Sequence, residues 1–568
     1  MYFNKNLFCI IVSVFLSSCV LNIYPQQRSE DINYQVGLIQ SSDKSQQLEG
    51  LKNLCRLGTE AKDAVPYLIN LLNKNDDDDE IKKLVVETLG EIKDDNEKTI
   101  LALINCFYDD NPYLNGKAVD ALAKIGDKVM SYIKNYLKDD NENVRWCTSI
   151  TLGKIIPASK DAVPELIGSL KDSNSNVRWS SAIALGNLGE KAKEGLPELL
   201  KCLNDVDREV RWASYIAIKK INPYFVFNSP SVSSVNAIID SLVPLLMDEL
   251  HVPGVSIAVI TNNEISGLRS FGVMNVNSEA KVTDETMFEA CSMSKPVFAL
   301  IVLKLVAQNK LDLDTPLSTY LEEPFYSDDA FGKMITARMI LSHTSGLPNW
   351  RKGEEERDGP LPIYFTPGER FSYSGEGFFY LQRVVEKITG KPLEEFAKEN
   401  LFQPLGLEHT SYMWTEKFDS LISCGHDASG NFLAKSKYLH PNSAYTLYTT
   451  AKEYAKLIVE ILRAFDSGEH LLSKKTIEQM LSPKVSVYIR DPIDRPGRAL
   501  GLFVYWGLGW AIDSTASGKI YYHSGANRTG FRCYSQFRID DGTGIVIMTN
   551  GLNGSELWRK LIGVIGDL

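Results

Sequence analysis

The chain has 568 residues, of which 44% are hydrophobic and 23% are charged, as in ordinary folded proteins. A chain of this length exceeds what one compact core accommodates, so two or more domains are expected. The formal net charge of −11 argues against a nucleic-acid partner, because no excess of basic residues is present to offset phosphate charge.

The first residues differ from the rest of the chain. Lys5 precedes a short apolar run over residues 7–16, and a helix of that length rises only about 15 Å, half of what a bilayer core requires. A secretory signal peptide over residues 1–18 is therefore predicted. The following Leu16-Ser17-Ser18-Cys19 resembles the lipobox of bacterial lipoproteins, in which the cysteine carries the lipid.

This resemblance implies lipidation at Cys19, a membrane attachment in the bacterial cell envelope, and an extended tether over residues 19–42. The alternative is a plain secretory signal with an incidental cysteine. The remaining cysteines are scattered without the close pairing of a metal or disulfide framework, so no metal site is expected.

Residues 43–225 contain an internal repeat. A Val-Arg-Trp triplet recurs at equal spacing, and the first two copies are each followed at a fixed offset by Leu-Gly. Asp or Asn clusters before each triplet suit helix N-caps. The triplets are Val144-Arg145-Trp146, Val177-Arg178-Trp179 and Val210-Arg211-Trp212, and the dipeptides are Leu152-Gly153 and Leu185-Gly186.

Two predicted helices per repeat resemble HEAT repeats, so an all-α solenoid is expected in which neighbouring repeats bury a continuous core. Such arrays imply a protein partner along one face. The regularly spaced Trp146, Trp179 and Trp212 fit either a binding stripe or the packing of one repeat on the next.

A linker is predicted over residues 226–234, where Pro and Ser residues gather. The second domain, residues 235–568, begins with an amphipathic helix over 236–249. A buried strand over 254–260 follows, with a hairpin partner over 265–271.

The candidate nucleophile comes next, in Ser292-Met293-Ser294-Lys295, ahead of an apolar helix over residues 297–308. Positions i and i+3 share one helix face, so the amine of Lys295 is expected beside the hydroxyl of Ser292. A serine hydroxyl is a poor nucleophile until a base lies within hydrogen-bond reach. Ser-x-x-Lys alone is weak evidence, and its context decides its meaning.

From Val232 to the C-terminus, further segments stand in the order found in serine beta-lactamases, and the chain resembles the class C branch of that family. The branch includes DD-peptidases, D-aminopeptidases and esterases. The resemblance implies an α/β (α+β) fold with an antiparallel sheet flanked by helices and a helical subdomain. It rests on segments 252–254, 292–295, 311–316, 341–348, 371–375, 404–407, 507–510, 523–525 and 549–550.

The resemblance also implies roles. Ser292 attacks a carbonyl and forms an acyl-enzyme, and Tyr373 relays protons with Lys295. His523-Ser524-Gly525 forms the third motif, in which His523 brings a partial positive charge and a hydrogen-bond donor. The backbone N–H groups of Ser292 and Ala526 form the oxyanion hole, next to the substrate-binding Ser524 and Gly525. No cofactor is required. His343, at a turn after an apolar helix, is interpreted as structural.

One departure affects the substrate. The family's second motif is Tyr-x-Asn, whose amide holds the acylamide group of a lactam or peptide, but this chain has Tyr373-Ser374-Gly375. Gly375 cannot make that bond, which favours an ester over an amide or D-amino-acid peptide and disfavours true beta-lactamase activity. The predicted function is an envelope-anchored serine hydrolase. The alternatives are a catalytically silent binding or sensor protein and an adaptor acting through its repeats.

Overall fold

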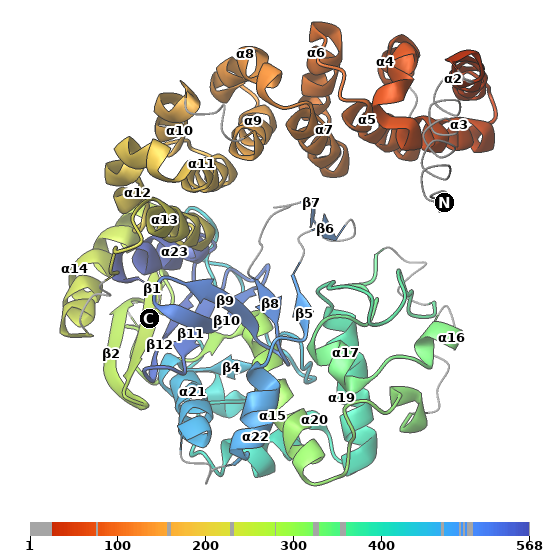
Figure 1. The fold of residues 1–568 in the computed structure, drawn as a ribbon. Coiled ribbons are helices and arrows are strands. Elements are labelled where there is room, and N and C mark those ends of the chain that lie inside the picture. The colour runs from red at the N-terminus through yellow and green to blue at the C-terminus, as the bar shows by residue number, and fades with distance from the viewer. Residues whose placement is uncertain are drawn as a thin grey trace, which may run out of the picture. The chain divides into compact units, whose positions relative to one another are not determined.

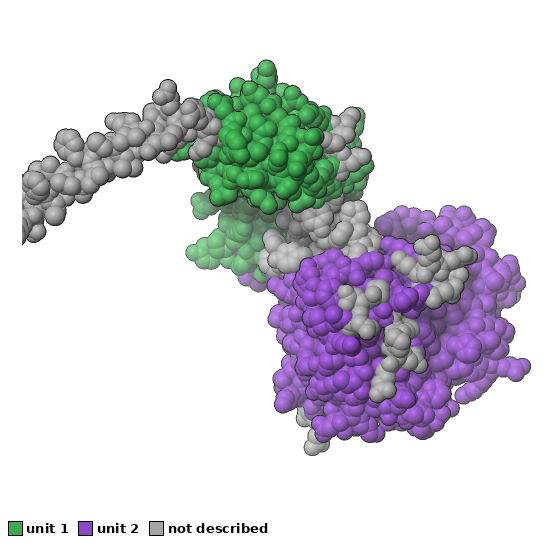
Figure 2. All heavy atoms as spheres, turned by 90° about the vertical axis from the view of Figure 1, so that its right-hand side faces the viewer, with its two compact units in different colours: residues 1–200, 213–224 green, residues 201–212, 225–568 purple. Residues whose placement is uncertain are grey.

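The computed structural model describes residues 25–74, 78–155, 161–227, 232–278, 280–321, 326, 329–352, 359–466, 471–487, 490–491, 495–496 and 504–566. The predicted signal peptide and Cys19 lie outside these residues. The chain forms two compact units, residues 1–200 with 213–224, and residues 201–212 with 225–568, which Figure 2 distinguishes by colour.

The first unit is built from short helices in successive pairs (Figure 1). This confirms the all-α array. Its α-helices, with those at its border with the second unit, are α2 (Pro25–Ile39), α3 (Lys44–Leu57), α4 (Val65–Asn73), α5 (Asp79–Ile92), α6 (Glu97–Asn105), α7 (Pro112–Ile125), α8 (Met130–Ile133), α9 (Glu142–Lys154), α10 (Val163–Ser169), α11 (Ser175–Leu188), α12 (Leu196–Cys202) and α13 (Arg208–Ile221).

The Val-Arg-Trp repeat has a physical basis in the turn before each helix. The valines of all three triplets are fully buried. The guanidinium of Arg178 donates to the carbonyls of Asp172 and Ser173 at 2.8 and 3.0 Å, satisfying oxygens at the end of the preceding helix segment. Arg145 does the same with Asp139 and Asp140. Each arginine therefore fixes the turn between two helices.

The Leu-Gly dipeptides recur because neighbouring helices touch at the glycine. A Cβ on Gly186 would lie 2.7 Å from the Cα of Ala217, and a Cβ on Gly153 would lie 2.9 Å from the Cα of Ala184. Such distances are far inside van der Waals contact, so only glycine allows this helix spacing. Of the three tryptophans, Trp146 is buried and the other two are half-buried.

The expected extended tether over residues 19–42 is wrong for most of its length, because Pro25–Ile39 form α2. Ile32, Val36 and Ile39 are buried at helical spacing, and a Cβ on Gly50 would lie 2.9 Å from atoms of Leu38 and Ile39. The helix therefore stacks on α3 as the later helices stack on one another. Sparse apolar residues suggested a tether, but Ile32, Val36 and Ile39 share one face of the helix.

The second unit contains an antiparallel sheet of eight strands in the order β2-β1-β12-β11-β10-β9-β8-β5 (Figure 1). The fold confirms the expected antiparallel sheet flanked by helices. The strands are β1 (Gly254–Thr261), β2 (Glu264–Gly272), β5 (Val485–Ser486), β8 (Tyr505–Trp506), β9 (Ala511–Thr515), β10 (Gly518–Ala526), β11 (Arg532–Arg538) and β12 (Thr543–Thr549), beside the two-stranded pairs β3 (Phe288–Glu289) with β4 (Tyr448–Thr449) and β6 (Arg490–Asp491) with β7 (Arg495–Pro496).

Both faces of the sheet are covered, which explains the continuous apolar run of β1. Val255, Ile257 and Val259 join a cluster with α14 (Val232–Leu250) and α23 (Gly554–Ile565). Ala258 and Ile260 instead join the larger core with α15 (Ser294–Ala307) and α21 (Ala451–Asp466). The predicted β1–β2 hairpin is confirmed, and its turn residues Asn262 and Asn263 both have positive φ.

The helical part of this unit lies between β3 and β4 in sequence. It packs around α15 and helps to form the larger core. The predicted linker 226–234 ends earlier than expected, since α14 begins at Val232. Among the helices described, none combines the length and apolar character needed to cross a bilayer. The remaining α-helices are α16 (Asp329–Gly332), α17 (Ala337–Leu341), α19 (Gly375–Thr389), α20 (Leu393–Ala397) and α22 (Lys474–Leu481).

Candidate active site

Ser292 lies in a single 3₁₀ turn, Cys291–Met293, which leads directly into α15. Cys291 has a φ of 53°, a left-handed conformation that is unusual for a residue with a side chain. This sharp turn brings the chain from β3 to the start of the helix. The side chain of Ser292 is partly exposed, although its neighbours on both sides are buried.

Lys295 lies one helical turn further on and is fully buried. Its Nζ is 3.3 Å from Ser292 Oγ and donates to the carbonyl oxygen of Ala444 at 2.9 Å. Burial lowers the pKa of Lys295 to about 7. Near neutral pH the amine is therefore partly unprotonated and can accept a proton from the serine.

Tyr373 comes from a distant segment and completes this group. The Nζ of Lys295 lies 4.7 Å from the centroid of the Tyr373 ring. The imidazole of His343 stacks on the same ring, with centroids 4.2 Å apart, and its Nδ1 accepts a hydrogen bond from the backbone N–H of Ser374. The interpretation of His343 as a structural residue at a turn agrees with these contacts and with its φ of 56°.

Two residues of the sheet, Trp506 on β8 and His523 on β10, lie beside this group of side chains. His523 is buried on β10, and its ring centroid lies 6.2 Å from that of Tyr373 and 5.6 Å from that of Trp506. The Trp506 ring also contacts His343 edge-on at 4.9 Å. Sheet and helical part thus contribute side chains to one site, as the three predicted motifs require.

The charge expected of His523 is corrected by this geometry. Burial lowers its pKa to about 3, so the ring is neutral at physiological pH. Its Nδ1 lies 2.8 Å from the carbonyl oxygen of Ser524, which can only accept, so the proton is on Nδ1. The Nε2 atom has no hydrogen-bond partner among the described residues and is an acceptor. His523 therefore offers a lone pair at Nε2 where a partial positive charge and a hydrogen-bond donor were predicted.

Gly525 and Ala526 end β10 beside the nucleophile. A Cβ on Gly525 would lie 2.2 Å from the carbonyl oxygen of Ala290 and 3.0 Å from Cys291 Cβ. This glycine is therefore needed so that β10 can approach the nucleophile segment, and not only for the approach of a substrate. Ser524 and Ala526 are exposed.

Gly375 is the first residue of α19, and the space for its missing side chain is already filled. A Cβ there would lie 2.6 Å from the indole of Trp350 and 2.8 Å from the carbonyl oxygen of Asn349. The Trp350 ring in turn meets Tyr445 edge-on at 5.4 Å, next to the Ala444 carbonyl that binds Lys295. The Trp350 indole thus occupies the space in which the asparagine side chain of a Tyr-x-Asn motif would begin.

Sequence reasoning missed several of these contributors. The Ala444 carbonyl carries no side-chain signal, and Trp350 precedes the second motif by many residues. Trp506 directly precedes the recognised Gly507-Leu508-Gly509-Trp510 segment, which was the available signal for it. No cluster of His, Cys, Asp or Glu suited to a metal ion occurs among the residues that the structure describes.

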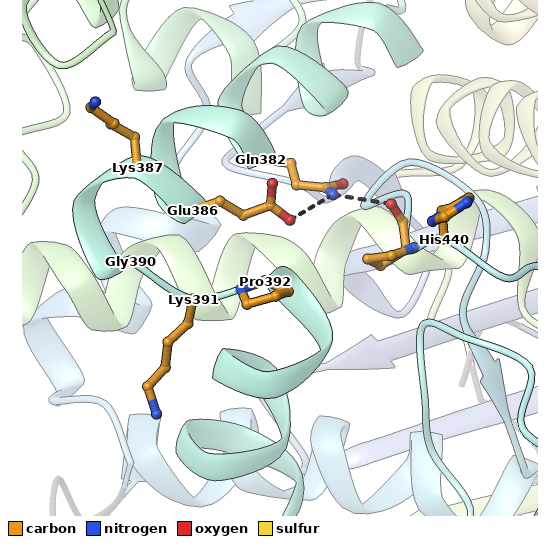
Figure 3. Close-up of a pocket in the computed structure, with 8 residues that line it drawn as sticks. Gln382, Glu386, Lys387, Gly390, Lys391, Pro392 and His440 are labelled. Atoms are coloured by element: carbon orange, nitrogen blue, oxygen red, sulfur yellow. Dashed lines mark hydrogen bonds between the residues drawn. The ribbon is translucent and has the colours of Figure 1, made fainter.

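A surface hollow of about 490 Å³ lies beside α19, and Figure 3 shows its lining. The Gln382 amide donates to Pro441 O at 3.0 Å and to Glu386 at 3.1 Å, while its oxygen accepts from Ser443 N at 2.7 Å. Gln382 therefore supports the loop that presents the Ala444 carbonyl to Lys295. The hollow itself contains none of the predicted catalytic residues.

Comparisons with known proteins found matches in both parts of the chain. Residues 156–219 match HEAT repeats. Protein flp of Staphylococcus aureus (strain MW2) is 23% identical over 345 residues, which cover 57% of this chain and 64% of that protein. Penicillin-binding protein 4 of Amycolatopsis lactamdurans is 25% identical over 349 residues, covering 57% of this chain and 88% of the relative.

Among solved structures, the octameric penicillin-binding protein homologue from Pyrococcus abyssi is similar, with a TM-score of 0.48, 23% identity, and coverage of 59% of this chain and 77% of that one. The Beta-lactamase family matches residues 239–566, which is more than half of the sequence and includes every residue of the site described above. The chain therefore belongs to the beta-lactamase family.

Proposed function

We propose that this protein is a serine hydrolase that cleaves its substrate through an acyl-enzyme on Ser292. The observation that carries the proposal is the 3.3 Å contact between Ser292 Oγ and the Nζ of a buried Lys295 whose pKa is about 7. A buried amine with this pKa has little structural use, since burying a charge costs stability. It matches the requirement of a base that works near neutral pH.

In the proposed reaction, Ser292 Oγ attacks the carbonyl carbon while its proton passes to the neutral amine of Lys295. The resulting oxyanion is stabilised by the backbone N–H groups of Ser292 and Ala526. Collapse breaks the bond to the leaving group, which takes up a proton relayed through Tyr373. Water then attacks the acyl-enzyme and gives its proton to the same basic groups. The bond from the carbonyl carbon to Ser292 Oγ breaks, the acid leaves, and the basic groups return the proton to Ser292 Oγ.

An ester of a small acid is the substrate class that the site supports best. Gly375 provides no amide for an acylamide group, and Trp350 fills the space of a longer side chain. His523 is neutral, so it provides no cation for a substrate carboxylate such as that of a lactam or a D-alanyl peptide. Amide and D-amino-acid substrates are therefore expected to turn over more slowly than uncharged esters.

The test is hydrolysis of a panel of short esters, D-amino-acid amides, D-Ala-D-Ala peptides and a chromogenic cephalosporin by the full chain and by Ser292→Ala. A matched control is Ser256→Ala, which removes a buried serine from β1. We expect ester turnover in the wild type and the control but not in Ser292→Ala. Turnover that persists in Ser292→Ala would contradict the proposal.

We further propose that the protein is lipid-anchored at Cys19 in a bacterial envelope, on the sequence Leu16-Ser17-Ser18-Cys19. Growth with a clickable fatty acid should label the wild type in its bacterial host and not Cys19→Ala. Equal labelling of the two would exclude this anchor.

A further inference from the structure

A buried carboxylate outside the proposed reaction lies three residues before the nucleophile. Glu289, on β3, is 1% exposed. Its Oε2 accepts hydrogen bonds from Thr529 Oγ1 at 2.7 Å, Tyr438 OH at 2.9 Å and Asn527 Nδ2 at 3.0 Å. A carboxylate is the side chain best suited to this, because it is an acceptor with several lone pairs and no donor. No cation within salt-bridge distance of Glu289 is found in the described part of the chain.

These three donors come from two different sides. Tyr438 belongs to the loop that precedes β4, whereas Asn527 and Thr529 belong to the turn that joins β10 to β11. Asn527 directly follows Ala526, and its carbonyl oxygen is held by Arg532 Nη1 at 2.6 Å. The Glu289 carboxylate therefore joins the segment that leads into Ser292 to the turn that follows Ala526.

This connection coincides with the two halves of the proposed oxyanion hole. One N–H belongs to Ser292 and the other to Ala526, and they come from segments far apart in sequence. Gly525 already shows how closely the segments approach, since a Cβ there would collide with the Ala290 carbonyl. The contact at Gly525 sets a minimum distance between β10 and the nucleophile segment. Van der Waals contact alone does not prevent one segment from shifting along the other. Directional, charge-assisted hydrogen bonds can prevent such a shift.

We infer that Glu289 is a positioning residue that fixes the 527–530 turn against the nucleophile segment and thereby sets the geometry of the oxyanion hole. The inference rests on the proposed function. It assigns Glu289 no contact with the substrate. Because an oxyanion hole acts on the transition state, loosening it lowers kcat and leaves KM nearly unchanged.

The test deletes hydrogen bonds to the Glu289 carboxyl group, first those from the turn after β10 and then one from the loop before β4. Asn527→Ala and Thr529→Val remove the bonds to the turn. Ser436→Ala removes a hydrogen bond that the loop of Tyr438 makes to the same carboxyl group, whereas Tyr438 itself is unsuitable as a control because its hydroxyl also accepts from Asn527 Nδ2 at 3.3 Å. In the full chain, kcat and KM are measured on an uncharged acetate ester, with the rate of inactivation by a fluorophosphonate as a second readout. The phosphonate forms a tetrahedral adduct and so depends on the same donors.

For Glu289→Gln, Asn527→Ala and Thr529→Val we expect kcat and the inactivation rate to fall by about tenfold to a hundredfold, with KM within about twofold. Ser436→Ala should stay within about twofold in all three quantities. Equal losses in Ser436→Ala, or a rise in KM with kcat unchanged, would overturn the inference. Thr529→Val keeps the side-chain volume and removes one hydrogen bond to Glu289. It therefore tests the role of Glu289 even if Glu289→Gln fails to fold.

Glu453→Gln controls for the general cost of neutralising a buried carboxylate. Glu453 is 4% exposed and accepts from Glu408 N, His409 N and Thr410 Oγ1, none of which belongs to the nucleophile segment or to the turn after Ala526. It should lower the melting temperature without changing kcat. A wild type that the phosphonate does not label at Ser292 would refute the proposed function itself, which separates that failure from a wrong role for Glu289.

Discussion

The repeat array and the hydrolase unit show two ways in which a sequence encodes a structure. In the array, one contact is used again and again: the glycine of one helix receives the alanine of the next, at Gly90 with Ala121, Gly153 with Ala184, and Gly186 with Ala217. In the hydrolase unit, the site is made once, from Ser292, Tyr373, Ala444 and His523.

The difference predicts where substitutions act. A change in the array disturbs a contact between neighbouring helices and should cost stability with no effect on chemistry. A change in the site removes a group that has no substitute elsewhere. It should cost activity and in some cases increase stability, because buried polar groups at active sites are retained at the expense of stability.

Lys295→Ala is expected to have the largest effect. Loss of the base beside Ser292 Oγ should lower kcat/KM for an ester by about a thousandfold, within the usual range for general-base catalysis. His523→Ala should lower it far less and mainly alter the preference among esters, because the neutral ring provides no charge. Steady-state kinetics of both variants checks this, and equal, small losses would contradict the assigned roles.

The pH dependence follows from the lowered pKa of Lys295. Catalysis requires the neutral amine, so kcat/KM should rise with pH, by up to about tenfold per unit below pH 7, and level off above it. Stability moves in the same direction. Between pH 7 and the ordinary lysine pKa the unfolded chain binds the additional proton, so the folded state gains stability as pH rises through this window.

The kinetic profile measures the first effect, and thermal unfolding of the wild type against Lys295→Met measures the second. The methionine variant should be the more stable protein at pH 7 and should lose the Lys295 component of the pH dependence. A profile that is flat across pH 6–8 would show that another group is the base.

Gly186→Val tests the array. Its Cβ would lie 2.7 Å from the backbone of Ala217, so α11 and α13 must separate, at a cost of about 1–3 kcal/mol. Gly168→Val is the matched control, because no atom lies within 4 Å of a Cβ built there. Calorimetry of the full chain should show a lowered transition for Gly186→Val alone, and kcat should be unchanged in both. A loss of kcat in Gly186→Val would show that a change in the repeat array also affects the chemistry of the hydrolase unit.

Gly375→Asn should have the smallest effect. Alone, the asparagine meets the Trp350 indole and gains nothing, so ester turnover should fall by no more than a fewfold. Trp350→Gly removes the indole, so that only a shift of the Asn349 carbonyl, 2.8 Å from the new Cβ, is needed to make room for the amide. In this double variant, turnover of an acylamide substrate should rise relative to the ester. The ratio of the two kcat/KM values measures this. An unchanged ratio in the double variant would show that this position does not select the substrate.

The fold was predictable where the sequence repeats or alternates. The Val-Arg-Trp and Leu-Gly spacings indicated the array, and the apolar run at 254–260 indicated a central strand. The α2 helix was missed because few of its residues are apolar, although Ile32, Val36 and Ile39 lie on one face. Sequence spacing predicts local pairs such as Ser292 with Lys295, because one helical turn determines their distance.

The rest of the site depends on tertiary contacts that no local pattern contains. Ala444 contributes a backbone carbonyl, so its residue type carries no information about its role. The motif suggested that His523 provides a partial positive charge and a hydrogen-bond donor. Its pKa is instead lowered by burial, next to Tyr373 and Trp506, which are distant in sequence. The order of the motifs therefore predicted which side chains lie together in the site, but their protonation states depend on burial, which only the structure gives.

The central claim is that the hydroxyl of Ser292 is made reactive by the amine of Lys295. Intact-mass and peptide analysis of the full chain after brief exposure to a fluorophosphonate tests it most directly. The account predicts one adduct, on Ser292, that forms faster as pH rises through 7 and is absent or slowed by orders of magnitude in Lys295→Ala. An adduct on another residue, or equal labelling of Lys295→Ala, would contradict it.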